Sequence, residues 1–284
     1  YCRMKGRADD KKFRQVAERV TNHVISLSGD KALSAYTIHN AKAFRDALRA
    51  RGAAPTTIKR NFAVVRSIWN LSAREHGNNK PNPFANMHFG TVVEPVKRLP
   101  VPIDSIRLVQ NECMKLDDDI RWLIALISDT VMRIAEAAGL PISDLHLYED
   151  IPFVRLKEHA SRPLKTAGSR RDIPLVGSAL WAVQRAAAEN DGPFLFPRYC
   201  STTNCKADYA SNTLNKWMKP FVPAGCVIHS FRHSLRDRLR AIECPADIID
   251  AIGGWATEGI GHQYGKGHSL TVMHGWMKRL STKV

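Results

Sequence analysis

Apolar residues in the first third of the chain recur at steps of three or four positions, which is the spacing of one face of an α-helix. A first helix is predicted over residues 11–27, and a second runs from its capping residue Thr37 to about Ala50. A third begins at Pro55 and stops at His76. The pattern therefore predicts a helical bundle. The expected inward stripes are Phe13, Val16, Val20, Val24 and Leu27; Ala43, Phe44 and Leu48; and Ile58, Phe62, Val65, Ile68, Trp69 and Leu71.

The rest of the chain mixes helical and strand patterns, after a proline-flanked basic linker at 91–101 where we expect a domain boundary. Short apolar stretches at 151–156 and 171–175 flank a basic turn and predict a hairpin. The predicted organisation is a helical domain over 1–95 and a mixed domain over 96–284, mainly α with a small antiparallel sheet (α+β). Helices of the second domain are expected at 103–114, 118–138, 180–189, 212–220, 229–242 and 246–252.

One more amphipathic pattern ends the chain, after the glycine-rich joint Gly265-Lys266-Gly267. Its spacing predicts a terminal helix whose Trp and Met side chains need an apolar groove to cover them. Two positions stay open for this helix: its own domain or a neighbouring protomer. The stripe consists of Leu270, Met273, Trp276, Met277 and Leu280.

Charge adds a partner class to this outline. The chain carries a net charge of +15, and residues 1–95, with 17 basic against 7 acidic residues, hold +10 of it. Such a balance favours a polyanion, and the third predicted helix places its cations among few acids, which favours a phosphate-facing surface over a solvated face. No apolar stretch is long enough to cross a membrane, so we expect a soluble, cytoplasmic protein. The candidate DNA-binding cations are Lys59, Arg60, Arg66 and Arg74.

Six cysteines in 284 residues are too sparse for a disulfide framework. One alternative is a four-ligand zinc site made of Cys200, Cys205, Cys226 and His229. The spacing between the first two is wide for a zinc knuckle, and no ligand lies between them. Scattered thiols without a metal are therefore the favoured interpretation.

The candidate chemistry is an ordered run of basic residues that leads to Tyr264, the only tyrosine after a His-x-x-Arg step. Guanidinium and ammonium groups hold phosphate, an imidazole moves a proton, an indole donates one hydrogen bond and a tyrosine supplies a nucleophile. This inventory suffices to attack a phosphodiester without a metal. Its members are Arg133, Lys165, His229, Arg232, Trp255 and Tyr264.

The order of these residues and the sequence around each of them resemble the tyrosine recombinase (phage integrase) family. The segment 34–77 is similar to the core-binding domain of that family, and its catalytic boxes correspond to 129–140, 164–175, 228–238 and 252–265. Trp255 stands where most members carry a histidine, and its indole N–H can donate but cannot shuttle a proton. The resemblance implies a helical bundle and a mixed catalytic domain that close as a C-shaped clamp around duplex DNA.

The resemblance also implies the reaction. The Tyr264 hydroxyl attacks a backbone phosphate, forms a 3′-phosphotyrosyl link and releases a 5′-hydroxyl. The covalent link conserves the bond energy, so no cofactor is expected. Arg133 and Arg232 would hold the non-bridging oxygens, and Glu136, one turn after Arg133 on the same predicted helix, suits a carboxylate that orients the guanidinium.

Proton transfers fall to a lysine and a histidine. Lys165 on the basic turn is the expected acid for the leaving oxygen, with Lys157 as its rival by position. His229 would accept the tyrosine proton or bond the phosphate. We expect His233 to pack or to support His229, and His262 is a weaker candidate for the same proton.

The function expected from the resemblance is a site-specific recombinase or integrase. A type IB topoisomerase shares the covalent chemistry, and a catalytically silent DNA-binding protein of the same fold is the alternative from another class. The expected partners are double-stranded DNA and three further copies of the chain, which form a homotetramer on two recombining sites through the C-terminal helix. The sequence leaves room for DNA-bending accessory proteins, and it names neither the target site nor the direction of the reaction.

Overall fold

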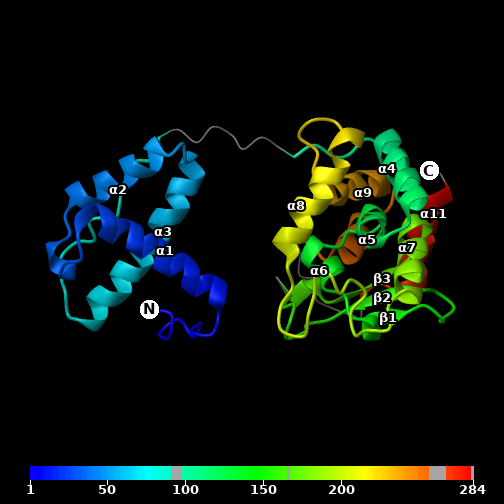
Figure 1. Ribbon diagram of the computed structural model, residues 1–284, viewed down its shortest axis with the longest axis horizontal. Helices are drawn as coiled ribbons and strands as arrows, with labels where there is room; N and C mark the ends of the chain where they lie inside the picture. The colour runs from blue at the N-terminus through cyan, green and yellow to red at the C-terminus, as the bar shows by residue number, and fades with distance from the viewer. Residues whose placement is uncertain (91–97, 165–166, 256–266, 283–284) are drawn as a thin grey trace. The chain divides into compact units, whose positions relative to one another are not determined.

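The protein is described by a computed structural model that covers residues 1–90, 98–164, 167–255 and 267–282. The chain divides into two compact units, Tyr1–Val96 and Lys97–Val284 (Figure 1). Each unit encloses apolar side chains of its own, so each has a separate hydrophobic core. No helix in the described part of the chain is long and apolar enough to cross a membrane.

The described residues 1–90 of the N-terminal unit form a bundle of three helices, as predicted. They are α1 (Lys11–Ser28), α2 (Ile38–Ala50) and α3 (Pro55–Glu75), with a short 3-10 turn at Leu33–Ala35 between the first two. Local chemistry fixes where the helices begin, because Asp10 caps α1 by accepting from the Phe13 amide at 2.9 Å. Pro55 similarly occupies the first turn of α3, where no amide hydrogen is needed.

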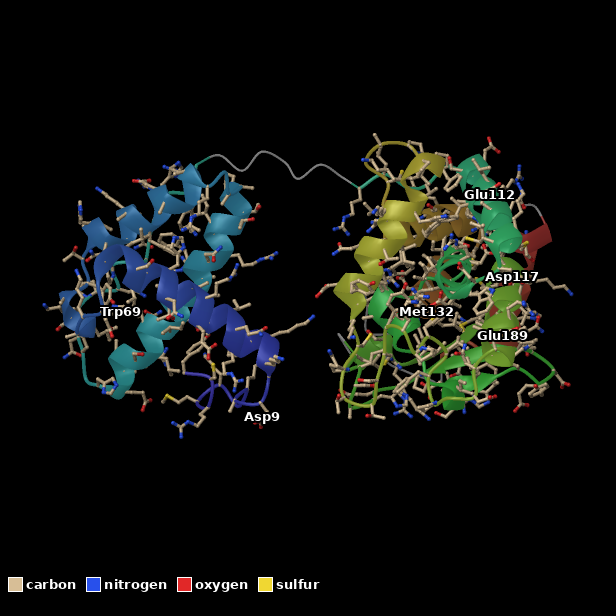
Figure 2. The ribbon with its side chains drawn as sticks, in the orientation of Figure 1. Asp9, Trp69, Glu112, Asp117, Met132 and Glu189 are labelled. Carbon is tan, nitrogen blue, oxygen red and sulfur yellow. The ribbon has the colours of Figure 1, made fainter. Side chains whose placement is uncertain are left out.

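The core of this unit follows most of the predicted stripes, and Trp69 lies in its interior (Figure 2). The first stripe is partly wrong. Val16 and Leu27 are exposed, whereas Ala17, Val20 and Val24 are buried. The buried face of α1 is therefore narrower than the predicted stripe. Residues spaced four apart rotate gradually around a helix, so Val16 lies outside the face that contacts α2 and α3.

The C-terminal unit packs most of its helices around α5 (Asp119–Ser128), which is apolar on all sides and buried from Trp122 to Ser128. Figure 1 shows the small sheet at one end of this unit. The remaining helices are α4 (Ile103–Leu116), α6 (Ile134–Ala138), α7 (Gly177–Ala188), α8 (Ala207–Met218), α9 (Ser230–Ala241), α10 (Ala246–Gly253) and α11 (Leu270–Thr282).

The predicted hairpin is confirmed and gains a third strand. Strand β2 (Phe153–Leu156) pairs antiparallel with β3 (Arg171–Pro174), with Leu156 opposite Arg171. The extra strand, β1 (Leu145–His146), is only two residues long, so no alternation marks it in the sequence. The described part of the chain thus has the predicted class, mainly helical with a small antiparallel sheet.

The single long helix expected at 118–138 is wrong. The chain leaves helical geometry after α5 and begins again at α6. Side chains explain the break: the Thr130 hydroxyl donates to the Leu126 carbonyl at 2.7 Å, and the Asp129 carboxylate accepts from the Ser178 amide at 3.1 Å. The break places Arg133 at the N-terminus of α6 instead of inside a helix.

The terminal helix α11 packs on its own unit, the first of the two positions left open by the sequence. Met273, Met277 and Leu280 are buried in a cluster with side chains of α9 and α10. Trp276 is only partly buried at the edge of the same cluster. An exchange of this helix between protomers would therefore have to uncover an existing core.

Candidate active site

The site begins at the N-terminus of α6, where Arg133 and Glu136 form a double link. The Arg133 amide donates to one Glu136 oxygen at 2.8 Å, and its guanidinium donates to the other at 2.6 Å. The same guanidinium nitrogen donates to the Ser169 hydroxyl at 3.0 Å. These contacts have the geometry expected of a carboxylate that orients the Arg133 guanidinium. Arg133 lies at the N-cap of α6 and not within the helix.

A second arginine, Arg171 at the start of β3, completes this arrangement and was not predicted. Its side chain is only 6% exposed, and it donates to Glu136 at 3.2 Å, to the Ser169 carbonyl at 2.8 Å and to the Ile252 carbonyl at 2.9 Å. One side chain thus ties α6, the β2–β3 connection and the end of α10 together. The only sequence signal was a Ser-x-Arg step where the second strand begins.

The carboxylate of Glu136 is shared by two guanidinium groups. Burial by itself would raise its pKa, but the charge of Arg171 and the hydrogen bonds from Arg133 outweigh burial and hold the pKa below its usual value. Glu136 is therefore an anion at neutral pH, and it keeps both arginines in place.

Arg232 on α9 lies beside this group and is buried, with 4% of its surface exposed. One terminal nitrogen donates to the Gly253 carbonyl at 3.2 Å, and the other is buried without a hydrogen-bond partner among the described residues. Burial, followed by the charges of Arg133 and Arg171, lowers its pKa to about 10. Arg232 therefore stays charged at neutral pH and is not one of the solvated arginines of α9.

Trp255 packs its ring against this arginine. The guanidinium carbons of Arg232 and Arg236 lie 4.9 and 4.6 Å from the ring centroid, within cation–π range. A Cβ atom on Gly253 would come within 1.9 Å of the Trp255 ring, so the glycine leaves the space that the indole fills. The indole thus supports the position of Arg232, a role that the expected hydrogen-bond donation did not include.

His229 occupies the N-cap position of α9 without a capping hydrogen bond from its side chain, and Arg232 and Arg133 are among the charges that act on it. Burial, then the charges of Arg232 and Arg98, lower its pKa to about 4, so the imidazole is neutral at neutral pH. His233, expected to pack or support, is exposed and meets His229 edge to face with 5.7 Å between ring centroids. The structure thus shows His233 in contact with His229 and not packed in the interior.

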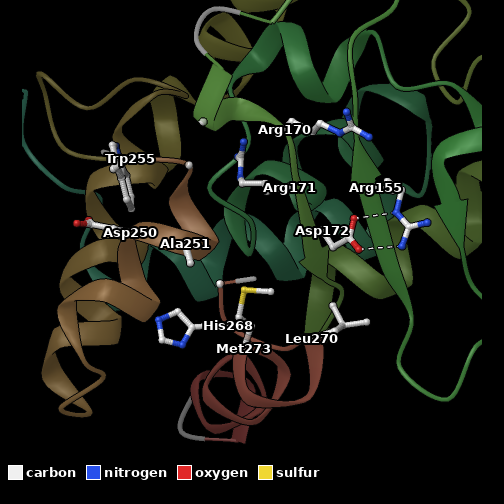
Figure 3. Close-up of a pocket in the computed structure, with 13 residues that line it drawn as sticks. Arg155, Arg170, Arg171, Asp172, Asp250, Ala251, Trp255, His268, Leu270 and Met273 are labelled. Carbon is white, nitrogen blue, oxygen red and sulfur yellow. Dashed lines mark hydrogen bonds and ion pairs between the residues drawn. The ribbon is translucent and has the colours of Figure 1, made fainter. Parts of the chain in front are cut away.

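An open cavity of about 500 Å³ borders this group (Figure 3). Figure 3 shows Trp255 at the end of α10, Arg171 on β3, and Leu270 and Met273 on α11 around it. Arg155 and Asp172 close one side with a two-pronged ion pair of 3.0 and 2.9 Å. Two residues of the candidate site therefore face a space that lies between three elements of the unit.

Three predicted residues, Lys165, Tyr264 and His262, lie outside the described residues. Lys157, the rival of Lys165, is described: its ammonium group lies 3.2 Å from a carboxylate oxygen of the buried Asp144. That ion pair gives Lys157 a structural partner.

The four side chains of the zinc alternative do not come together in the structure. Cys200 and Cys205 face each other across a short bridge, but the Cys226 thiol points to the Leu99 and Pro100 carbonyls instead. Among the described residues, no three histidine, cysteine, aspartate or glutamate side chains gather closely enough to hold a metal ion.

The candidate DNA-binding cations all lie on α3, beside its buried face. Lys59, Arg60 and Arg74 are exposed, and Arg66 is half-buried. Within the described part of the chain none of the four forms an ion pair, whereas Arg45 on α2 is held by Asp46 at 2.8 Å. Their charges are therefore available to an external anion.

Comparison with known proteins places this geometry in context. A sequence model of the phage integrase family matches residues 105–267, and no curated protein matches the chain. The structure is similar to the Tn1549 transposon integrase in complex with circular intermediate DNA, with TM-score 0.66 and 17% identity over 98% of this chain and 97% of that chain. It is also similar to a lambda integrase tetramer bound to a Holliday junction, with TM-score 0.65 and 13% identity over 89% of this chain and 71% of that chain. At 17% and 13% identity, these structural similarities show a shared fold and nothing further.

Proposed function

The chain belongs to the phage integrase family, and from this premise we propose that it is a site-specific DNA recombinase. It cuts and rejoins DNA strands through a 3′-phosphotyrosyl intermediate. The family match spans the segments that carry Arg133, Lys165, His229, Arg232 and Tyr264, which supports the assignment.

The observation that carries this proposal is that two arginines share one carboxylate and a third, buried arginine lies close to them. Arg133 and Arg171 share Glu136, and Arg232 lies close enough for both to depress its pKa. One carboxylate cannot neutralise three guanidinium groups, so the site keeps an excess of positive charge. A phosphodiester, whose non-bridging oxygens gain charge during displacement, is the ligand that such a site stabilises.

Arg133 and Arg232 are the proposed phosphate ligands. One nitrogen of Arg232 has no hydrogen-bond partner among the described residues, and a phosphate oxygen would supply an acceptor for this buried donor. Arg171 is a positioning residue, because its donors are engaged by Glu136 and by the Ser169 and Ile252 carbonyls. Trp255 holds Arg232 from its ring face.

Proton transfers are assigned to residues with different charges. His229 is neutral in the free protein and is therefore able to accept a proton from the attacking hydroxyl of Tyr264. Lys165 donates a proton to the leaving 5′-oxygen. The arginines supply the positive charge that a divalent metal provides in other phosphoryl-transfer enzymes, so the proposed reaction requires no metal.

Duplex DNA is the proposed partner of both units, which would close around it as a clamp. The cations of α3, which form no ion pair with any described residue, and the charge of +10 on residues 1–95 support contacts to phosphates.

The lambda integrase structure contains a tetramer on a Holliday junction. We extend that assembly to this chain and propose four protomers on two recombining sites, with DNA-bending proteins as accessory partners.

A nicked suicide duplex tests the function. Because the short strand beyond the cut diffuses away, an active protein becomes covalently trapped and yields a denaturant-resistant complex. Wild type should form this complex with excess chelator present, and Tyr264→Phe should bind the duplex without forming it. A trapped Tyr264→Phe complex would reject the nucleophile, and cleavage that requires added magnesium would reject the metal-free reaction.

The same preparation separates the alternatives. A topoisomerase relaxes a supercoiled plasmid without a recombination site and without a second duplex, whereas a recombinase joins two marked duplexes into recombinant products. A protein that binds DNA but is trapped on no substrate tested, including fragments from its own chromosomal junctions, is a silent DNA-binding protein.

A further inference from the structure

Two cysteines outside the proposed phosphate site form a close pair. Cys200 and Cys205 are opposite residues of an antiparallel bridge. The flanking backbone bonds, from the Ser201 amide to the Asn204 carbonyl at 2.9 Å and from the Lys206 amide to the Tyr199 carbonyl at 2.7 Å, make them a non-hydrogen-bonded pair. In such a pair the Cα atoms lie about 4.5 Å apart, inside the range of about 4.4–6.8 Å that a disulfide spans.

The pair contacts the helix that carries the candidate site. The Cys205 thiol donates to the Ala135 carbonyl of α6 at 3.8 Å. A Cβ atom on Gly139, at the end of α6, would lie 3.2 Å from the same sulfur. Ala135 lies between Arg133 and Glu136, so a change at Cys205 reaches the helical turn on which that ion pair is built.

The second thiol contacts the connection between β2 and β3. Cys200, 6% exposed, interacts with Ser161, and the neighbouring Arg162 is buried with a donated bond to the Gly139 carbonyl at 3.1 Å. The two sulfurs therefore lie between α6 and the segment that leads to Lys165. The other described cysteines, Cys2, Cys113, Cys226 and Cys244, take no part in this arrangement.

We propose that Cys200 and Cys205 form a dithiol modification site that low-molecular-weight disulfides oxidise, and that the resulting disulfide disturbs α6. One cysteine thiolate attacks the small disulfide, forms a mixed disulfide and releases one small thiol. The second cysteine then attacks the mixed disulfide and releases the other small thiol. Two electrons pass to the small disulfide, which is reduced to two thiols, and both protons leave the protein.

The oxidised pair differs from the reduced pair in two ways that change its contact with α6. The Cys205 sulfur no longer carries a hydrogen for the Ala135 carbonyl, and the bond to Cys200 draws it to about 2.05 Å from that sulfur. Because Arg133 and Glu136 lie in the same turn as Ala135, the guanidinium moves relative to the phosphate. This effect on catalysis rests on the proposed function, whereas formation of the disulfide does not.

Burial sets the rate of the modification. It raises the pKa of Cys205 to about 11 and also raises that of Cys200, so little thiolate exists at neutral pH. Oxidation should be slow near pH 7. As long as the pH is below the thiol pKa, the rate should rise about tenfold for each unit by which the pH is raised. The site thus responds to lasting oxidation and not to a brief pulse.

The test treats the full chain with glutathione disulfide. Intact mass and peptide mapping should give a Cys200–Cys205 disulfide without a retained glutathione, and reductant should reverse it. Amide hydrogen exchange at 134–138 should rise in the oxidised protein. Trapping on the nicked duplex should slow by about tenfold to hundredfold, the range expected for a small misplacement of a catalytic group.

Matched variants separate the pair from the other thiols. Cys226→Ser should behave as wild type, while the double variant Cys200→Ser/Cys205→Ser, which has no thiol at this site, should keep full activity under oxidant. Mixed glutathione adducts alone, or a mapped disulfide that leaves both exchange at 134–138 and trapping unchanged, would overturn the proposal. Mass and exchange do not depend on DNA cleavage, so a reduced chain that fails to cleave counts against the proposed function alone.

Discussion

Individual side chains in this protein act mainly by fixing other side chains. Arg171 is the strongest example, since it reaches Glu136, the turn before β3 and the end of α10 from one buried position. Trp255 acts in the same way on Arg232, through its ring face. The reactivity proposed for the site therefore depends on residues that need not touch DNA.

Arg171→Lys tests this dependence. Lysine keeps the charge, but a single ammonium group cannot reach three acceptors in the planar arrangement of a guanidinium. We expect trapping on the nicked duplex to slow by about tenfold to hundredfold, with duplex affinity unchanged. Arg171 is the charge that most lowers the pKa of Glu136, so a lysine whose ammonium group lies farther from that carboxylate should also move the acid limb of the rate profile to higher pH.

The control for this change is Arg155→Lys, on the neighbouring strand. Arg155 forms a comparable two-pronged pair with Asp172, but its side chain is 48% exposed and makes no contact with Glu136. It should leave both rate and pH profile as in wild type. An Arg171→Lys protein with wild-type rate and profile would assign Arg171 to stability alone.

The environment of His229 predicts how the stability of the protein depends on pH. The pKa of His229 is about 4 in the folded chain and about 6.5 in an unfolded one. Between these values the unfolded state binds the extra proton, so His229 contributes its stability in full above about pH 6.5 and loses it as pH falls towards 4, by up to about 1.4 kcal/mol per pH unit.

Two measurements check the titration of His229. Its ring resonances should titrate near pH 4 in the free protein and at higher pH in Arg232→Met, which removes the largest opposing charge. His229→Gln should also flatten the dependence of the free energy of unfolding on pH below 6.5. A midpoint near 6.5 in the wild-type protein would mean that the imidazole is hydrated and apart from the cations.

At the scale of elements, the terminal helix has a defined place. Its apolar stripe fills a core shared with α9 and α10, so removing the whole helix would expose Leu235, Leu239 and Ile252 to water. Truncation after Gly267 would therefore lower stability in addition to any effect on the proposed assembly. Point substitutions within α11 distinguish the two.

Met277→Ala and Val272→Ala form a matched pair on α11. Met277 is fully buried and Val272 is 43% exposed. We expect Met277→Ala to lower the free energy of unfolding of the DNA-free protein by about 2–5 kcal/mol, and Val272→Ala to change it by less than about 0.5 kcal/mol. Equal, small effects of both substitutions in a dilute monomer would show that α11 leaves its own unit, the arrangement needed for exchange between protomers.

At the scale of the whole molecule, charge is divided unequally between the units. Residues 1–95 carry +10, and residues 96–284, which contain the candidate active site, carry +5. We expect the isolated 1–95 fragment to bind duplex DNA weakly and with steep salt dependence, each neutralised phosphate contributing about −0.9 to the slope of log affinity against log salt.

The cations of α3 give this prediction its control. Substituting Lys59 and Arg60 with alanine should reduce the slope by about 0.9 for each phosphate that the variant no longer neutralises. Arg45→Ala should change it less, because Asp46 already neutralises Arg45. A slope that is flat, or equally reduced by both changes, would mean that α3 faces away from DNA.

The sequence by itself determined the features that depend on neighbours in the chain. Helical spacing located the three helices of the N-terminal unit, and the stretches around a basic turn located the β2–β3 hairpin. The order of residue types towards Tyr264 identified the family, which the match over 105–267 confirms. These succeed because periodicity, capping and motif order are local properties.

Only the tertiary structure decided which charges act together. Arg171 and Ile252 are 81 positions apart and Arg133 and Ser169 are 36 apart, so no local pattern links them. The end of α5, the burial of Arg232 and the pairing of Cys200 with Cys205 likewise depend on how distant segments pack. Burial is a property of the folded chain, and it sets the pKa values of His229 and Arg232 as well as the place of α11.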